Sequence, residues 1–327
     1  MTDTLLPVEK VKEKLFSARA ITILTHINPD ADTLGTGLGI YNLCKKHLSA
    51  RVEIVNVSKD LPRHLDFLPD YGKIKHKPDF EKSLLVACDS GSAERLGTDL
   101  SGKDVINIDH HYSNEMYGTV NVVIPQYASA SQVAYALFKE IWQIDKESAT
   151  CFYTALLSDT RYFTTSSVNH EVFRVAAEMV ELGVDPSNAA FHLTQRRSLA
   201  SLRILEHALH SLQLYLEGKV AVMTITAEDI EASGATMPDM DGIVDYARSL
   251  AIVEIAVLLI GQKNGEVRVS LRSKSTDVSR VAAYCGGGGH KVAAGFTVKQ
   301  IPLQEIIDTI LKQITILGLI DGKTKQR

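Results

Sequence analysis

The sequence predicts an α/β protein with a parallel sheet in its N-terminal domain and a smaller α+β C-terminal domain. Three observations support this fold class. In the first half, short apolar runs alternate with helical patterns, which is typical of parallel strands joined by helices. From residue 129 to about residue 191, apolar residues recur every three or four positions, as in packed helices. The last third carries two hairpin patterns and one amphipathic helix.

The strands of the first domain are predicted from apolar runs rich in β-branched residues. A glycine-containing helical pattern over residues 34–48 follows the first run, so the chain can return to start a second parallel strand. The five predicted strands cover residues 20–25, 51–57, 83–88, 105–108 and 119–124.

The second domain is predicted from its turns. One hairpin is expected across Glu217–Gly218–Lys219, and another across Asn264–Gly265, which is the strongest short hairpin signal. We therefore expect antiparallel strands here, followed by an amphipathic helix over residues 303–317.

The length of 327 residues suggests two domains. Gly183 and Pro186 interrupt the helical pattern, so the boundary is expected there. We predict a first domain over residues 1–185, a linker over 186–205 and a second domain over 206–327.

The composition excludes several classes of protein. An apolar fraction of 45% with 23% charged residues indicates a folded globular chain. A net charge of −4 argues against a protein that coats long nucleic acid. The four cysteines form no CxxC pair, which argues against a disulfide framework and fits the cytoplasm. The longest apolar stretch is too short to cross a bilayer, so no membrane association is expected.

Acidic and histidine residues follow three of the predicted strands, and another acid interrupts a helical apolar run. These candidates are His26, Asp30, Asp32, Asp89, Asp109, His110, His111 and Asp159. Ligands bind at the carboxyl ends of parallel strands, so the candidates are expected to converge. Carboxylates with imidazoles suit divalent metals, and several carboxylates favour Mn²⁺. Five acids in one pocket would repel one another unless cations neutralised them, and two metal ions are the usual solution in phosphoester hydrolysis.

Each segment also has an ordinary explanation. Asp30 and Asp32 could cap the next helix, Asp89 could begin a turn, and Asp159 could be a solvated helix acid. Adjacent histidines are often incidental. Four independent segments that share one chemistry favour a metal site over these alternatives.

The segments HINPDAD, CDS, DHH and SDT, followed by GGGGHKVAAG, resemble the ordered motifs of the DHH phosphoesterase superfamily with its DHH-associated C-terminal domain. The resemblance covers essentially the whole chain. In length and layout the chain is most similar to the NrnA-like group, whose members are oligoribonucleases and phosphatases of 3′-phosphoadenosine 5′-phosphate.

The resemblance implies roles for individual residues. Metal ligands would be His26, Asp30 and Asp89 for one ion, and Asp32, Asp89, His110 and Asp159 for a second. His111 would act beside the scissile phosphate, and Asp109 would orient a neighbouring histidine, so that Asp89, Asp109 and His111 form the catalytic set. Ala31 and Thr33 stand where the family often has Gly and Ala, and the spacing of the acids is kept.

Substrate-binding residues are expected in the second domain. A glycine run can offer backbone N–H groups to an anion, and an arginine can bind phosphate through two hydrogen bonds. The resemblance places the terminal phosphate of the substrate on an Arg-Ser pair. The alternatives are a flexible turn and a solvated strand end. The candidates are Arg272, Ser273, Gly287, Gly288, Gly289 and His290.

The resemblance therefore predicts a cytoplasmic, metal-dependent phosphoesterase with two divalent ions, expected to be Mn²⁺. Its substrates would be short RNA oligonucleotides and nucleoside bisphosphates, and it would hydrolyse the oligonucleotides to mononucleotides. A homodimer is left open. The alternative is a cyclic di-AMP or linear dinucleotide phosphodiesterase with the same site. A RecJ-like exonuclease fits the short acidic chain less well, and a non-catalytic nucleotide sensor would usually have lost ligands.

Overall fold

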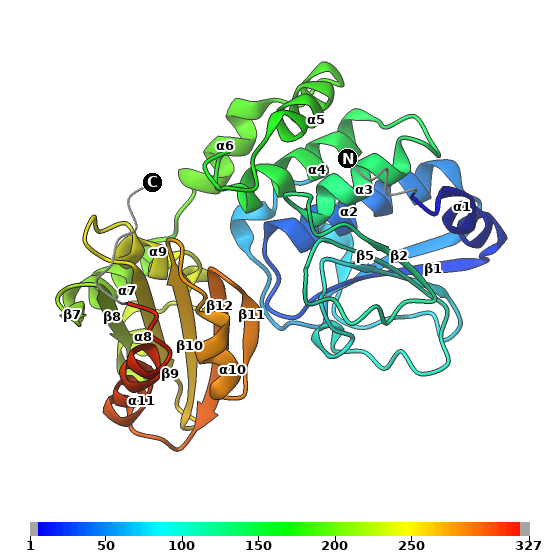
Figure 1. Cartoon of the computed structure of the whole chain (residues 1–327). Coiled ribbons are helices and arrows are strands. Elements are labelled where there is room, and N and C mark those ends of the chain that lie inside the picture. The colour runs from blue at the N-terminus through cyan, green and yellow to red at the C-terminus, as the bar shows by residue number, and fades with distance from the viewer. Residues whose placement is uncertain (1–5, 321–327) are drawn as a thin grey trace. The chain divides into compact units, whose positions relative to one another are not determined.

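The computed structural model describes residues 6–320 and shows two compact units (Figure 1). Within the described residues, the first unit ends at Arg196 and the second begins at Arg197. The predicted domains, 1–185 and 206–327, include end residues that lie outside the described part of the chain.

The segment predicted as a linker, residues 186–205, is mostly helical. Helix α6 (Pro186–Thr194) belongs to the first unit, and α7 (Leu199–His210) begins the second. Both helices begin at a side-chain cap, because Asp185 and Ser198 each accept a hydrogen bond from a backbone N–H in the first helical turn. Proline at the first helical position supports the start of α6 rather than interrupting the helix.

The first unit contains a six-stranded sheet in which every pairing is parallel, which confirms the predicted architecture. The strand order is β3-β2-β1-β4-β5-β6, so the order of the strands reverses beside β1. Such a reversal is where open α/β sheets bind their ligands. The strands are β1 (Ala20–Thr25), β2 (Arg51–Val55), β3 (Ile74–Lys75), β4 (Leu84–Cys88), β5 (Val105–Asp109) and β6 (Val120–Val123).

Helices cover one face of this sheet and form the main core. Ile21 and Ile23 point to that face, whereas Leu24 lies in a smaller apolar cluster on the other. Figure 1 shows α2 (Ala31–His47), α3 (Ala130–Phe138) and α4 (Lys146–Asp159) grouped on one side of the strands. The unit also contains α1 (Val8–Ser17) and α5 (His170–Glu181), with short 3₁₀ turns at Arg63–Leu65, Tyr71–Lys73 and Glu94–Leu96.

Two glycines let α2 and α4 approach closely. A Cβ on Gly35 would lie 2.6 Å from the carbonyl oxygen of Cys151, and a Cβ on Gly39 would lie 2.3 Å from the ring of Phe152. Any larger side chain would push the helices apart. Asp32 lies in the first turn of α2, and Asp159 is the last residue of α4. The close packing of the two helices therefore also sets the distance between these two predicted metal ligands.

The second unit contains a six-stranded sheet in the order β11-β12-β10-β9-β8-β7. Its strands are β7 (Gln213–Tyr215), β8 (Val220–Ile225), β9 (Ile255–Gly261), β10 (Glu266–Ser273), β11 (Gly288–His290) and β12 (Ala293–Lys299). Both predicted hairpins are present. The predicted antiparallel strands are present in four of the five pairings, but the sheet is mixed, because β8 and β9 pair in parallel. Helical segments connect these two strands, and such a crossover returns the chain in the same direction.

Helices pack on both faces of this second sheet. One apolar cluster joins the sheet to α10 (Ser279–Tyr284) and α11 (Leu303–Ile316), and Figure 1 shows these two helices on the same side. A second cluster joins the opposite face to α7, to α9 (Ile243–Arg248) and to the 3₁₀ turn Met237–Met240. Helix α8 (Ala227–Ser233) packs against α7.

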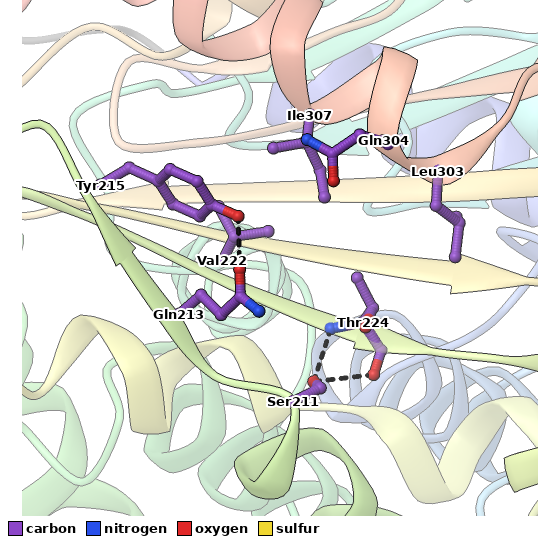
Figure 2. Close-up of a pocket in the computed structure, with 8 residues that line it drawn as sticks. All are labelled: Ser211, Gln213, Tyr215, Val222, Thr224, Leu303, Gln304 and Ile307. Atoms are coloured by element: carbon purple, nitrogen blue, oxygen red, sulfur yellow. Dashed lines mark hydrogen bonds between the residues drawn. The ribbon is translucent and has the colours of Figure 1, made fainter.

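A pocket of about 290 Å³ lies where α11 crosses β7 and β8 (Figure 2). The Ser211 hydroxyl bonds both the N–H and the carbonyl of Thr224, and the Tyr215 hydroxyl donates to the Gln213 side chain. None of the predicted substrate-binding residues lines this pocket.

Among the helices of residues 6–320, none combines the length and the apolar character that crossing a bilayer requires.

Candidate metal centre

The predicted metal ligands emerge side by side because the strand ends are aligned. Thr25 pairs with Cys88, so His26 and Asp89 leave adjacent strands at the same level. The backbone N–H of Asp89 donates to the carbonyl of Ile108 at 2.9 Å, which ties this residue to β5 as well. Asp89 has a φ of 57°, a left-handed conformation that is uncommon for a non-glycine residue. Strained backbone of this kind concentrates at functional sites.

The first cluster is formed by His26, Asp30 and Asp89. The His26 Nε2 atom lies 3.8 Å from Asp30 Oδ1 and 3.5 Å from Asp89 Oδ2. The Nδ1 atom of the same ring lies 2.9 Å from the carbonyl oxygen of Ile27, to which Nδ1–H can donate. Such a bond leaves Nε2 as the unprotonated nitrogen facing the acids, which is the arrangement of a metal-binding histidine.

The second cluster is formed by Asp32, His110 and Asp159. The His110 Nε2 atom lies 3.8 Å from Asp32 Oδ2, 3.7 Å from Asp159 Oδ2 and 3.6 Å from Asp89 Oδ1. Its Nδ1 atom lies 3.3 Å from the carbonyl oxygen of Tyr127. His110 therefore repeats the arrangement of His26, with a backbone carbonyl behind the ring and carboxylates in front of it.

Asp89 connects the two clusters, since Oδ2 faces His26 and Oδ1 faces His110. The Oδ1 atom is buried and accepts no hydrogen bond. A buried carboxylate oxygen without a donor is costly unless a cation faces it. The donor set, the shared carboxylate and this uncompensated oxygen fit divalent metal ions.

The electrostatics of the site also favour bound positive charge. Burial and the neighbouring carboxylates raise the pKa of Asp89 well above its usual range. Burial and the nearby Asp30 raise the pKa of Asp32. The Asp159 side chain is 38% exposed, yet desolvation and the charge of Asp32 raise its pKa to about 7. Although burial lowers it, the pKa of His110 is raised by Asp159 and Asp32. Bound cations would favour the ionised carboxylates at neutral pH.

The two acids of the first motif also bind helix N-termini. Asp30 caps α2, because its Oδ1 accepts from the backbone N–H groups of Asp32 and Thr33. The Asp32 carboxylate accepts from the N–H groups of Ala130 and Ser131, at 2.7 and 3.2 Å, in the first turn of α3. The capping role considered for Asp30 is therefore present, and the same carboxyl group also belongs to the first cluster.

His111 and Asp109 form a pair next to the two clusters, and His111 also belongs to a third group of possible ligands with Asp89 and His110. The His111 Nδ1 atom lies 2.7 Å from Asp109 Oδ1 and 3.6 Å from Asp89 Oδ1. Asp109 is completely buried. Burial alone would raise the pKa of Asp109, but hydrogen bonds from His111 and Asn114 hold it below its usual range. An ionised Asp109 can only accept, so Nδ1 of His111 carries the proton of this hydrogen bond.

Thr33, which departs from the small residue common in the family, takes part in the site. Its hydroxyl accepts from the N–H of His26 at 3.2 Å and donates to the carbonyl of Cys88 at 2.9 Å. The side chain is completely buried. It therefore bridges the ends of β1 and β4, which deliver His26 and Asp89.

Replacing Thr33 with valine is expected to lower the free energy of unfolding by about 1–3 kcal/mol, because two buried backbone groups lose their partner. The affinity for Mn²⁺ should fall as well, because the Thr33 hydroxyl no longer links the strand ends that carry His26 and Asp89. Urea unfolding and calorimetric titration with Mn²⁺ measure both. Thr33→Ser keeps the hydroxyl and is the control; equal stability of the valine and serine variants would contradict this role.

The predicted substrate residues lie together in the second unit. Arg272 and His290 pair with the same residue, Ala293, from the two sides of β12. The Ser273 hydroxyl donates to the carbonyl of Thr276 at 2.5 Å. Lys274, which follows this pair, donates to the carbonyls of Leu250 and Ala251 and so anchors the strand end.

The glycine run is shaped partly by packing. A Cβ on Gly287 would lie 2.2 Å from the carbonyl oxygen of Gly295. The N–H groups of Gly286 and Gly287 donate to carbonyls of α10. Gly288 and Gly289 belong to β11, which lies at the edge of the sheet. The run is therefore an ordered helix-to-strand connection, rather than the flexible turn considered as an alternative.

Sequence reasoning missed three features of the site. These are the Thr33 bridge, the backbone donors at the start of α3 and the side chain of Asn114, which bonds Asp109. The serine that caps α3, Ser129, was visible as a helix-start signal. Nothing in the local sequence shows that this helix points at Asp32, because the two segments are 98 residues apart.

The fold and the site define an α/β protein with three connected carboxylate–histidine groups at the strand-order reversal of a parallel sheet. Residues 20–156 match the model of the DHH family, N-terminal domain, and residues 217–315 match the DHHA1 domain. The chain belongs to the DHH family, and it is a hydrolase of phosphoester bonds.

Relatives along the whole chain agree with this assignment. The chain is 33% identical over 301 residues to the bifunctional oligoribonuclease and PAP phosphatase NrnA of Thermus thermophilus, covering 90% of this chain and 89% of the relative. It is 23% identical to the protein of the same name from Bacillus subtilis, covering 85% and 89%. The cyclic-di-AMP phosphodiesterase PdeA of Listeria monocytogenes is 24% identical, and the match covers 94% of this chain but 49% of PdeA.

A solved structure shows the same fold. It is that of an exopolyphosphatase-related protein from Bacteroides fragilis, with a TM-score of 0.85 and 23% sequence identity. The match covers 96% of this chain and 98% of that chain.

Proposed function

We propose that this protein hydrolyses short oligoribonucleotides to mononucleotides and also removes a phosphate from 3′-phosphoadenosine 5′-phosphate. The observation that supports this most directly is the pair of ligand clusters that Asp89 connects, with Oδ2 facing His26 and Oδ1 facing His110. The relatives named NrnA support the choice of substrates, because the similarity extends over nearly the full length of both chains.

The acidic and histidine residues of the two clusters are proposed to hold metal ions. His26, Asp30 and Asp89 would hold one divalent ion, and Asp32, His110 and Asp159 would hold a second with Asp89 shared. When bound, such ions supply Lewis-acid charge to the phosphoryl oxygens and acidify the attacking water.

His111 would contribute the proton chemistry beside the metal ligands. Its Nδ1–H is held by Asp109, which leaves Nε2 as the nitrogen that can accept or return a proton at the scissile phosphate. Fixing the ring in advance avoids the entropy cost of orienting it during the reaction.

A substrate panel with Mn²⁺ tests this function. It contains 5′-phosphorylated RNA and DNA of two to seven nucleotides, 3′-phosphoadenosine 5′-phosphate, cyclic di-AMP and pyrophosphate. We expect the highest kcat/KM for the shortest RNA, with measurable phosphate release from 3′-phosphoadenosine 5′-phosphate. Preferential opening of cyclic di-AMP would instead favour the activity named for PdeA, and rapid cleavage of pyrophosphate alone would refute the proposal.

In the second unit we propose that Arg272, Ser273, the glycines 287–289 and His290 bind the terminal phosphate of the substrate. The convergence of Arg272 and His290 on Ala293 supports this, since both can donate hydrogen bonds to an anion.

Arg272→Ala is expected to raise KM for a 5′-phosphorylated RNA dinucleotide by at least tenfold and to change kcat less. A hydrogen bond to a charged group contributes about 1.5–3 kcal/mol, which corresponds to roughly 10- to 150-fold in affinity. Arg268→Ala, four residues earlier on the same strand, is the control. A dinucleotide without the terminal phosphate should show no such difference. An equal rise in KM for both dinucleotides would exclude a contact with that phosphate.

The proposal also covers the number of metal ions, the native metal and the location in the cell. We expect two ions per chain with Mn²⁺ as the native metal, because carboxylates outnumber imidazoles among the ligands. We also expect a cytoplasmic location, where buried free cysteines such as Cys88 and Cys151 stay reduced. Metal analysis and sedimentation of the purified protein would measure the ion count and the oligomeric state.

A further inference from the structure

We propose that Asn114 is a positioning residue that holds the Asp109 carboxylate against His111 and joins it to the chain segment after Asp89. The inference rests on the proposed function, because it concerns the ring expected to act at the phosphate. It concerns a side chain that lies outside both ligand clusters.

Asn114 uses its full hydrogen-bonding capacity. Its Nδ2 group donates to Asp109 Oδ2 at 2.5 Å and to the carbonyl of Ser90 at 3.1 Å. Its Oδ1 atom accepts from the side chain of Asn107 at 2.9 Å and from the N–H of Met116 at 2.7 Å. An asparagine has two donor hydrogens and two acceptor sites, so this side chain has one orientation that satisfies all of them.

These bonds link the two strands that deliver the central ligands. Ser90 follows Asp89 at the end of β4, and Asp109 ends β5. Asn107, which orients Asn114, lies within β5 itself. A backbone hydrogen bond next to Asn114 connects the same two segments, since the N–H of Glu115 donates to the carbonyl of Gly91 at 2.9 Å. Asn114 is thus anchored to rigid strands rather than to a loose loop.

Asn114 affects the orientation of the His111 ring through Asp109. The buried Asp109 carboxylate has one oxygen on His111 Nδ1 and the other on Asn114 Nδ2. With both oxygens occupied the carboxylate cannot rotate, so the ring keeps its orientation and its Nδ1–H tautomer. Without Asn114 the buried Oδ2 loses its donor, and the carboxylate is free to turn away from the ring.

The neighbouring strand β6 supplies a matched control. Asn121 accepts from the Asn107 side chain at 2.9 Å, as Asn114 does, and its Nδ2 bonds the carbonyls of Met116 and Gly118. It makes no bond to Asp109. A variant at this position therefore removes hydrogen bonds to Asn107 and to the loop before β6 without touching the Asp109–His111 pair.

We expect Asn114→Ala to lower kcat for the RNA dinucleotide by about 10- to 100-fold, the usual effect of removing such an orienting partner, with KM changed less than about threefold. Asn114→Asp keeps the size of the side chain but replaces the donor, and it should lose kcat similarly. It serves as the second variant if the alanine protein does not fold. Asn121→Ala should keep kcat within about threefold even if its melting temperature falls.

Nitrogen-15 NMR of histidine-labelled, metal-free protein gives a readout that needs no substrate. The His111 Nδ1–H signal, assigned with His111→Gln, should shift or broaden in both Asn114 variants and stay in place in Asn121→Ala. An unchanged His111 signal in the Asn114 variants, or equal loss of kcat in Asn114→Ala and Asn121→Ala, would overturn the proposal. If no RNA or bisphosphate is hydrolysed by the unmodified protein, the proposed function fails, while the NMR comparison still decides the role of Asn114.

Discussion

Asp89→Asn is expected to lower kcat/KM for a 5′-phosphorylated RNA dinucleotide by about a thousandfold. Asp89 is the carboxylate that connects the two clusters, and its buried Oδ1 accepts no hydrogen bond. The amide keeps the shape of the side chain but removes one negative charge and one acceptor oxygen from the carboxylate that faces both clusters. Metal ions contribute several kcal/mol to the transition state in such reactions, and each 1.4 kcal/mol is a factor of about ten in rate.

The matched control is Asp99→Asn. Asp99 is an exposed loop acid of the same unit, and its carboxylate accepts from the N–H of Ser101 at 2.9 Å. This variant makes the same change of charge and size away from the clusters, so its kcat/KM should stay within about twofold. Manganese-dependent turnover that survives Asp89→Asn at saturating metal would show that the site assignment is wrong.

The stabilisation of the protein by Mn²⁺ is expected to be larger at about pH 8 than at about pH 5.5. In the metal-free protein, burial and neighbouring acids raise the pKa of Asp89 and bring that of Asp159 to about 7. The folded state then binds more protons than the unfolded chain above pH 4, so stability falls as the pH rises towards 7. Added metal stabilises the ionised carboxylates and removes this loss, while at low pH protons compete with the metal.

Melting temperatures measured after EDTA treatment and after addition of Mn²⁺ test this expectation. His26 changes stability with pH in the opposite direction. Burial lowers the pKa of its imidazole. Below about pH 6.5 the unfolded chain therefore binds a proton that the folded state does not, and stability falls as the pH falls. The Asp89→Asn variant separates the two contributions: without metal it should lose much of the destabilisation above pH 4 and keep that of His26. Identical pH dependence of the unmodified protein and Asp89→Asn would contradict the electrostatic description of the site.

Much of the fold followed from local patterns. The apolar run of β1 is buried along its whole length, and the two hairpin turns occur where turn residues predict them. β3 was missed because two residues are too few to produce a pattern. The parallel pairing of β8 and β9 was missed because strand direction depends on the crossover between them, which a local pattern does not contain.

The sequence by itself determined which acidic and histidine residues come together at the candidate metal centre. His26, Asp89 and His110 each follow a strand, and aligned parallel strands bring their carboxyl ends together. Only the tertiary structure decided which groups orient these ligands. The Thr33 hydroxyl, the first turn of α3 and the Asn114 side chain reach the site through hydrogen bonds between segments distant in sequence. Such bonds depend on distances and directions set by packing, and they leave no periodic signal in the chain.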